Sequence, residues 1–302
     1  MRDVSQDKTK IIKEMATKAS VQSKIDSSFY ERFNVKRGLR NSDGTGVLVG
    51  LTEVGEVMSY IVDDAERIPV EGRLFYQGIE ISDIVSGFYQ NKRFGFEETA
   101  YLLLFGELPT AEQQSEFEAL LSACRDLPDN FTEDMILKAP SPDIMNKLAR
   151  SVLALYSYDA DPDSLDITNV LRQCIELIAR FPVMIAHAYM ARRHYVEKES
   201  LFLHSPKPEY NTAQNILHMI RADGQFSELE ARILDIALVL HAEHGGGNNS
   251  TFTTHVVTSS ATDTYSSVAA SLGSLKGPRH GGANIKVVQM FEDMKKNVSD
   301  WT

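Results

Sequence analysis

The sequence has few cysteines, no excess of basic residues and no long apolar run. Its two cysteines, Cys124 and Cys174, form no CxxC pair, which excludes a disulfide framework and a thiolate zinc site and fits a reducing compartment. The formal net charge of −11 argues against nucleic acid as a partner. No apolar run approaches the roughly 18 residues of a membrane span, and the N-terminus has no signal-peptide pattern. We therefore expect a cytoplasmic protein with neither a nucleic-acid nor a membrane partner.

The chain does have apolar residues at helical spacing over most of its 302 residues. Phe96–Phe105 is an apolar segment followed by Gly106, and Thr110 and Gln113 have the spacing of a capping box. Two short β-favouring runs around turn residues lie within 59–78. There is no internal repeat and no alternation of strand and helix patterns. We therefore predict an all-α fold with a minor β ribbon near residues 59–78.

Further helices are predicted near the N-terminus, in the middle of the chain and after residue 227. A polar, lysine-rich amphipathic segment covers 10–33, and apolar residues recur at helical spacing over 144–158 and 166–181. A second capping box at 227–230 opens a helix that we expect the glycines after His244 to end.

One predicted helix, 264–276, consists largely of serine, alanine and glycine. Ser266, Ala270 and Ser274 follow one another at i, i+4 spacing, so small side chains line one face. Such a face lets another helix approach closely, which suits a subunit interface. An ordinary buried helix accounts for the same composition.

Two histidines stand directly beside glycines in the last quarter of the chain. His244 precedes three glycines in HAEHGGGNN, and His280 lies between GP and GG in GPRHGGAN. Glycine lets the backbone approach a ligand closely, and imidazole can donate or accept a proton near neutral pH. His241 and His244 are spaced i, i+3, but no further ligand lies at a recognised metal-binding spacing, so we expect no metal. The two segments predict a site for a small molecule.

The residues alone leave alternatives open for both histidines. His244 lies close to Asn248, and ligand contact and a structural role at a helix end fit this context equally well. His280 should stand at the start of a new helix, whose positive dipole end would lower the pKa of the imidazole and keep it neutral. A neutral imidazole can donate a hydrogen bond to a carbonyl that becomes an enolate. A loop histidine that faces water is the alternative.

The chain resembles the citrate synthase family in four segments that follow the family's order. These are GRLFYQG at 72–78, FEETAYLLLFGELPT at 96–110, HAEHGGGNNSTFTT at 241–254 and SLGSLKGPRHGGAN at 271–284. The resemblance implies that His244 binds the oxaloacetate carbonyl and that Asn248 lines the same pocket. It also implies that His280 hydrogen-bonds the thioester oxygen of acetyl-CoA as it enolises. The implied fold is almost wholly helical, and acetyl-CoA is a substrate, with no cofactor required.

The chain also departs from the family pattern. The family's second catalytic histidine lies in a G-x-G-H segment followed by D-P-R, and its catalytic aspartate comes later still; neither segment occurs among these residues. We therefore expect 1–283 to form the large dimerisation domain and 284–302 to begin a small domain whose remainder is absent. This chain alone should form a homodimer and be catalytically inactive. Gln77 stands where relatives usually carry arginine.

The function expected from the resemblance is that of a citrate synthase. This acyl-CoA:oxaloacetate C-acyltransferase condenses acetyl-CoA with oxaloacetate to citrate and CoA in the tricarboxylic acid cycle. A 2-methylcitrate synthase, which shares the fold and both histidines, stays open as an alternative. So does a non-catalytic, dimeric binding module with the same fold.

Overall fold

The chain divides into two compact units, residues 1–49 and 50–302. The computed structural model describes Met15, Asp26, 28–33, Val47, 52–63, 66–243, 245–278, 280–281 and 283–299. In the first unit it shows one short helix, α2 (Ser28–Arg32); the rest of the helical start predicted over 10–33 lies almost entirely outside the described residues. The domain boundary predicted at residue 283 falls within the second unit and stays a prediction.

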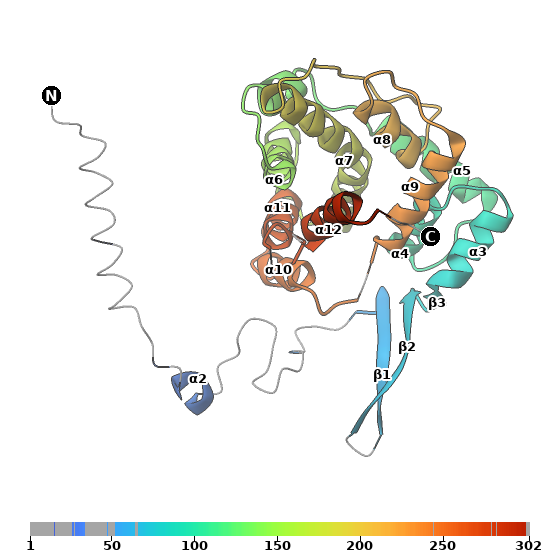
Figure 1. Cartoon of the computed structure of the whole chain (residues 1–302), viewed down its shortest axis with the longest axis vertical. Coiled ribbons are helices and arrows are strands. Elements are labelled where there is room, and N and C mark those ends of the chain that lie inside the picture. Colours follow the sequence, from blue (N-terminus) through green and yellow to red (C-terminus); the bar gives the residue numbers. More distant parts are fainter. Residues whose placement is uncertain are drawn as a thin grey trace. The chain divides into compact units, whose positions relative to one another are not determined.

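The second unit is mostly helical and carries one small antiparallel sheet (Figure 1), which confirms the predicted all-α fold with a minor β ribbon. Its elements, in chain order, are β1 (Gly55–Asp63), β2 (Glu66–Tyr76), β3 (Ile79–Glu80), α3 (Ile81–Gln90), α4 (Phe96–Phe105), α5 (Ala111–Ala123), the π-helical turn η1 (Thr132–Leu137), α6 (Ile144–Leu155), the 3-10 turn η2 (Tyr156–Tyr158), α7 (Ile167–Tyr195), α8 (Thr212–Ile220), α9 (Glu228–Leu240), α10 (Asn249–Thr258), α11 (Thr264–Leu275) and α12 (Ala283–Asn297).

Local capping signals set several of these helix boundaries, as the sequence predicts. Thr110 and Gln113 form a capping box at the start of α5, and Ser227 and Glu230 form another at the start of α9. Gly106 ends α4 with a left-handed φ of 83°. Each of these signals acts within one turn of the helix it bounds, which is why the sequence reveals it.

Two helix ends differ from the sequence expectation. α7 continues past 181 to Tyr195, because Pro182 is accommodated inside the helix and the residues after it are buried in the core. α9 ends at Leu240, so the glycines that follow His244 do not end it. A tyrosine side chain from the sheet contacts the backbone at this end, as described with the site below.

The sheet is a ribbon, and Tyr76, the last residue of β2, packs against the helices. β1 and β2 pair antiparallel, with Gly55 opposite Tyr76 at one end of the register. A two-residue turn, Gln77-Gly78, joins β2 to β3, and both residues have positive φ, at 48° and 78°. Gln77 is thus a turn residue in this structure.

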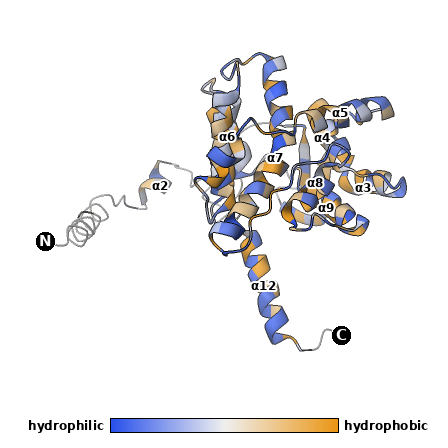
Figure 2. Cartoon of the chain, turned by 90° about the horizontal axis from the view of Figure 1, so that it is seen from above, coloured by the Kyte–Doolittle hydropathy of each residue, from blue (hydrophilic) through white to orange (hydrophobic). Residues whose placement is uncertain are grey.

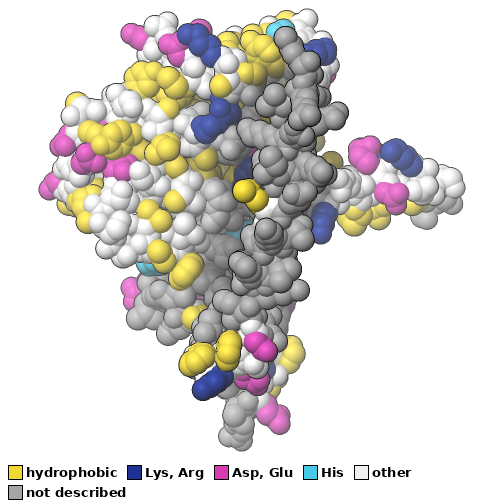
Figure 3. All heavy atoms as spheres, turned by 90° about the vertical axis from the view of Figure 1, so that its left-hand side faces the viewer, with side chains coloured by type: hydrophobic (Ala, Val, Ile, Leu, Met, Phe, Trp, Pro, Cys, Tyr) yellow, Lys and Arg dark blue, Asp and Glu magenta, His cyan; other side chains and the backbone are white. Residues whose placement is uncertain are grey.

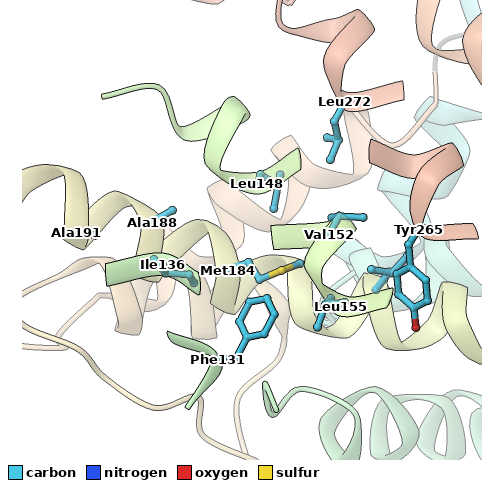
Figure 4. Close-up of a cluster of buried hydrophobic side chains, with 11 residues drawn as sticks. Phe131, Ile136, Leu148, Val152, Leu155, Met184, Ala188, Ala191, Tyr265 and Leu272 are labelled. Carbon is cyan, nitrogen blue, oxygen red and sulfur yellow. The ribbon is translucent and has the colours of Figure 1, made fainter. Parts of the chain in front are cut away.

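The largest cluster of buried side chains lies between α6, α7 and α11 (Figure 4). Leu148, Val152 and Leu155 of α6, Met184 of α7 and Leu272 of α11 belong to this cluster. Burying each such side chain contributes about 1.5–3 kcal/mol relative to leaving it in water. This cluster fixes α11, and with it the segment that leads to His280.

α7 runs through the core of the unit. By length and composition alone it is apolar enough to cross a membrane, with a mean hydropathy of 1.3 over its most apolar window. However, 61% of that window is buried inside the fold, as expected of a core helix. From the sequence we expect no segment of this kind, and α7 is an exception to that expectation by length and composition.

A buried carboxylate joins α9 to the start of α4. Asp235 is 1% exposed, and its Oδ2 and Oδ1 accept hydrogen bonds from the backbone N–H groups of Gly95 at 2.7 Å and Phe96 at 3.1 Å. Burial raises the pKa of Asp235 to about 6, although the two N–H donors favour the carboxylate.

We expect Asp235 to make the chain less stable as the pH rises from about 4 to about 6. The folded-state pKa lies above the unfolded value of about 3.9, so the folded state holds the proton more tightly and its advantage disappears as the proton is lost. The shift corresponds to at most about 3 kcal/mol. Urea unfolding of the wild type and Asp235→Asn across this range should show their difference in unfolding free energy changing by up to that amount. Titrations of other groups cancel in the difference, and a constant difference would contradict the prediction.

Candidate active site

The predicted site comes from the segments that follow α9 and α11. The structure describes two of its three predicted residues, Asn248 and His280, whereas His244 lies outside the described residues. α10 and α11 pack as an antiparallel pair, and the Oγ atoms of Thr254 and Ser271 are 2.6 Å apart between them (Figure 1). The start of α10 and the end of α11 therefore lie at the same end of the pair.

A shallow, mostly apolar cavity of about 390 Å³ runs between these two helices and α7. Thr251, in the first turn of α10, and Leu275, the last residue of α11, both line it. Asn248 and the turn that contains His280 extend from these two helix ends. The fold thus brings two of the three predicted residues to one end of one helix pair.

Asn248 links the glycine loop to α10. Its Oδ1 accepts hydrogen bonds from the Thr251 N–H at 2.9 Å and from the Ser250 hydroxyl, which makes it the N-cap of the helix. Its Nδ2 donates to the carbonyl of Gly245 at 3.0 Å. The same side chain therefore orients both the loop that follows Glu243 and the positive end of the α10 dipole.

The glycine loop lies close against the first residues of the β ribbon. Gly245 has a φ of 90°, and a β-carbon there would lie 3.2 Å from Cγ2 of Val57. A β-carbon at Gly55 would collide with the side chain of Glu243. Oε1 of Glu243 accepts a hydrogen bond from the Gly245 N–H at 2.5 Å. The loop and β1 thus require glycine at both points of closest approach.

Tyr76 is a site residue that the sequence analysis missed. Its side chain is fully buried, and burial raises the pKa of its hydroxyl, which stays protonated. The hydroxyl lies 2.8 Å from the carbonyl oxygen of Val239 and 3.0 Å from that of Glu243, and it accepts the Glu243 N–H at 3.2 Å. The segment GRLFYQG already carries the family resemblance, but nothing local in it shows that Tyr76 reaches a helix more than 160 positions away.

His280 lies, half-buried, in the turn that ends α11 rather than at the start of α12 as expected. Its N–H donates to the carbonyl of Gly277 at 3.0 Å, and the N–H of Gly281 donates to that of Leu275 at 2.8 Å. α12 begins only at Ala283. A β-carbon at Gly281 would collide with the Leu275 carbonyl, so the turn that presents His280 requires glycine there.

Other polar features lie away from this end of the helix pair. In the part of the chain that the structure describes, no group of three or more His, Cys, Asp or Glu side chains could hold a metal ion. A larger cleft, of about 810 Å³, is lined by residues of α4, α5 and α8. There the buried Glu97 accepts the N–H of Thr212 at 2.8 Å, and burial lowers the pKa of Arg125 despite the nearby Glu97 charge. His280 does not line this cleft.

Residues 43–302 match the family model of the citrate synthase C-terminal domain. The chain is 34% identical over 276 residues to the citrate synthase of Haloferax volcanii, covering 89% of this chain and 64% of that protein. It is 32% identical over 274 residues to 2-methylcitrate synthase 1 of Corynebacterium glutamicum, with 88% and 64% covered. The crystal structure of citrate synthase from Pyrobaculum aerophilum matches with a TM-score of 0.69 at 27% identity, covering 86% of this chain and 62% of that one. The chain therefore spans less than two thirds of the length of these relatives.

Proposed function

The chain belongs to the citrate synthase family, and we propose that it supplies the oxaloacetate-binding and enolate-stabilising part of a citrate synthase active site. The observation that carries the proposal is the placement of Asn248 and the His280 turn at one end of the α10–α11 pair. His244 directly follows Glu243, and the carbonyl oxygen of Glu243 lies within hydrogen-bond distance of the Tyr76 hydroxyl.

In the proposed reaction, His280 donates a hydrogen bond to the thioester oxygen of acetyl-CoA as the methyl group loses a proton. The base is an aspartate in a part of the family sequence that these residues do not include. The enolate carbon attacks the carbonyl carbon of oxaloacetate, which His244 polarises while Asn248 lines the pocket. Hydrolysis of the resulting citryl-CoA thioester then gives citrate and CoA. The chemistry calls for no metal or redox cofactor.

We also propose that the chain forms a homodimer through the face of α11 that carries small residues. Ser266, Ala270 and Ser274 are only partly covered by the rest of the unit, which leaves room for a helix of a second copy to approach. Figure 3 faces the left-hand side of Figure 1; in this view hydrophobic side chains occur at many places on the described surface, and charged side chains occupy only small parts of it.

A second exposed surface supports the proposal that 284–302 begins a further domain. α12 extends away from the other helices of its unit (Figure 2) and is amphipathic. Val287, Phe291 and Met294 share one face at helical spacing and are between 40% and 52% exposed. An apolar helix face of this kind is normally covered, and the relatives have additional sequence that could cover it.

The acyl donor is the finer part of the proposal. We favour acetyl-CoA, and the similarity to 2-methylcitrate synthase 1 of Corynebacterium glutamicum supports propionyl-CoA as the alternative. The two donors differ by one methylene, which a pocket discriminates by about 10–200-fold. Relative rates in the complete enzyme distinguish them.

Calorimetric titration of the chain with oxaloacetate tests the proposed site. We expect binding, and His244→Ala should weaken it by about 10–100-fold, because a hydrogen bond to a charged ligand contributes about 1.5–3 kcal/mol. His194→Ala is the matched control, since His194 lies at the end of α7 and its Nδ1 is bonded to the carbonyl of Glu199 at 2.7 Å. Equal affinity of all three proteins would refute the assignment of His244.

A further inference from the structure

We propose that Tyr76 is the positioning residue of the histidine–glycine loop, residues 243–248. It would set the backbone from which His244 extends and would not itself touch the substrate. The inference rests on the proposed function only for the identity of the ligand. The contact between Tyr76 and the loop is a property of the fold.

The Tyr76 hydroxyl occupies a specific place in the hydrogen-bond ladder of α9. In a continuing helix the N–H of Glu243 would donate to the carbonyl of Val239, four residues earlier. Here the hydroxyl stands between them, 2.8 Å from the Val239 oxygen and 3.2 Å from the Glu243 nitrogen. A side chain inserted into the ladder in this way ends or bends a helix. This explains why α9 ends at Leu240, before the glycines.

The same hydroxyl holds the peptide group that leads to His244. It accepts the Glu243 N–H, and its one proton is shared between the Val239 carbonyl oxygen at 2.8 Å and the Glu243 carbonyl oxygen at 3.0 Å. The peptide bond is planar, so the Glu243 carbonyl and the backbone nitrogen of His244 move together. Fixing one therefore restricts where the His244 side chain can start.

The Tyr76 side chain is itself held firmly by its neighbours. The Tyr76 ring is buried in a cluster with Ile84, Phe88, Leu102 and Val239, from α3, α4 and α9. Its neighbour across the ribbon, Gly55, lies so close to Glu243 that a β-carbon there would collide with its side chain. The loop thus contacts the ribbon at two neighbouring residues, the Tyr76 hydroxyl and Gly55.

A purely structural role for Tyr76 is the rival interpretation, and a matched variant separates the two. Tyr76→Phe removes one buried hydroxyl at the loop. Tyr265→Phe removes another buried hydroxyl, which donates to Asp159 Oδ2 at 2.7 Å in the separate cluster of α6, α7 and α11. Both variants lose the same atom, so a general loss of stability should affect them alike.

Hydrogen–deuterium exchange and NMR of labelled histidines can distinguish the two roles. A purely structural role would change the amide exchange rates and the histidine signals to a similar extent in both variants. In Tyr76→Phe the Glu243 amide loses its acceptor, and we expect it and the Gly245 amide to exchange at least about tenfold faster, with no comparable change in α6. The imidazole signals of His244, assigned with His244→Gln, should shift in Tyr76→Phe and stay unchanged in Tyr265→Phe. Oxaloacetate should bind about tenfold more weakly to Tyr76→Phe and within about twofold of wild type to Tyr265→Phe.

The outcomes separate this inference from the proposed function. Selective faster exchange and a shifted His244 signal, in a chain that never binds oxaloacetate, would support the positioning role and refute the ligand. Exchange and signals that change equally in both variants, or in neither, would overturn the positioning role. If Tyr76→Phe does not fold, the wild type decides: a Glu243 amide that exchanges as fast as an amide without a hydrogen bond also overturns the positioning role.

Discussion

The purified 302-residue chain should release CoA from acetyl-CoA and oxaloacetate at least about 10⁴-fold more slowly than a full-length family member. Its sequence holds no G-x-G-H segment followed by D-P-R, so it lacks the second histidine and the catalytic aspartate that the family resemblance implies. A general acid or base contributes about 10²–10⁴-fold to a rate, and an oxyanion donor about 10²–10³-fold. Together these losses place turnover at least about 10⁴-fold below that of a full-length family member, as measured by thiol release.

A full-length citrate synthase assayed beside the chain serves as the positive control, and propionyl-CoA is tested in the same series. Citrate or 2-methylcitrate formed by the chain at more than about 10⁻⁴ of the full-length rate would contradict the prediction. Oxaloacetate binding without turnover would agree with a catalytically incomplete site. Absence of both would favour the non-catalytic binding module.

Asp159→Ala should destabilise the chain by about 2–4 kcal/mol, a large fraction of the stability of an ordinary domain. The Asp159 side chain is 3% exposed and accepts hydrogen bonds from Arg172 at 2.8 Å, Tyr265 at 2.7 Å and Gln173 at 3.0 Å. Removing the carboxylate leaves the buried hydroxyl and amide without this partner. Arg172 is 40% exposed and can regain water, which keeps the cost below that of a fully buried ion pair.

The matched control for this prediction is Asp163→Ala. Asp163 also accepts a tyrosine hydroxyl, that of Tyr156 at 2.8 Å, but on the exposed surface, so its loss should change stability by no more than about 0.5 kcal/mol. Urea unfolding near neutral pH measures both variants. A similar small effect of the two substitutions would show that the Asp159 network contributes little.

The Asp159 prediction also has a definite pH dependence. Burial alone would raise the pKa of Asp159, but the hydrogen bonds from Arg172, Tyr265 and Gln173 outweigh it and hold the pKa well below its ordinary value. The stabilisation is therefore present above the unfolded pKa of about 3.9 and is lost as the pH falls below it. The difference between wild type and Asp159→Ala should shrink in acid, opposite in direction to the effect of Asp235.

Local sequence signals predicted much of the secondary structure. The capping boxes at Thr110 and Ser227 and the left-handed Gly106 were readable because a cap and the helix it bounds are adjacent in sequence. Pro182 shows the limit of such signals, since tertiary packing carries α7 through it. The helix expected after His280 begins at Ala283, but His280 itself lies in the preceding turn, which the bonds to the Gly277 and Leu275 carbonyls close.

The sequence by itself determined the family, the helical fold and which segments carry the chemistry, because motif order, periodicity and caps are written within short stretches of chain. Only the tertiary structure decided where α9 ends, that Tyr76 holds the loop before His244, and that Asp235 caps α4. In each case the partners are more than 130 positions apart. A hydrogen bond over such a separation depends on how the elements pack, and no local pattern encodes which buried hydroxyl or carboxylate reaches which backbone group.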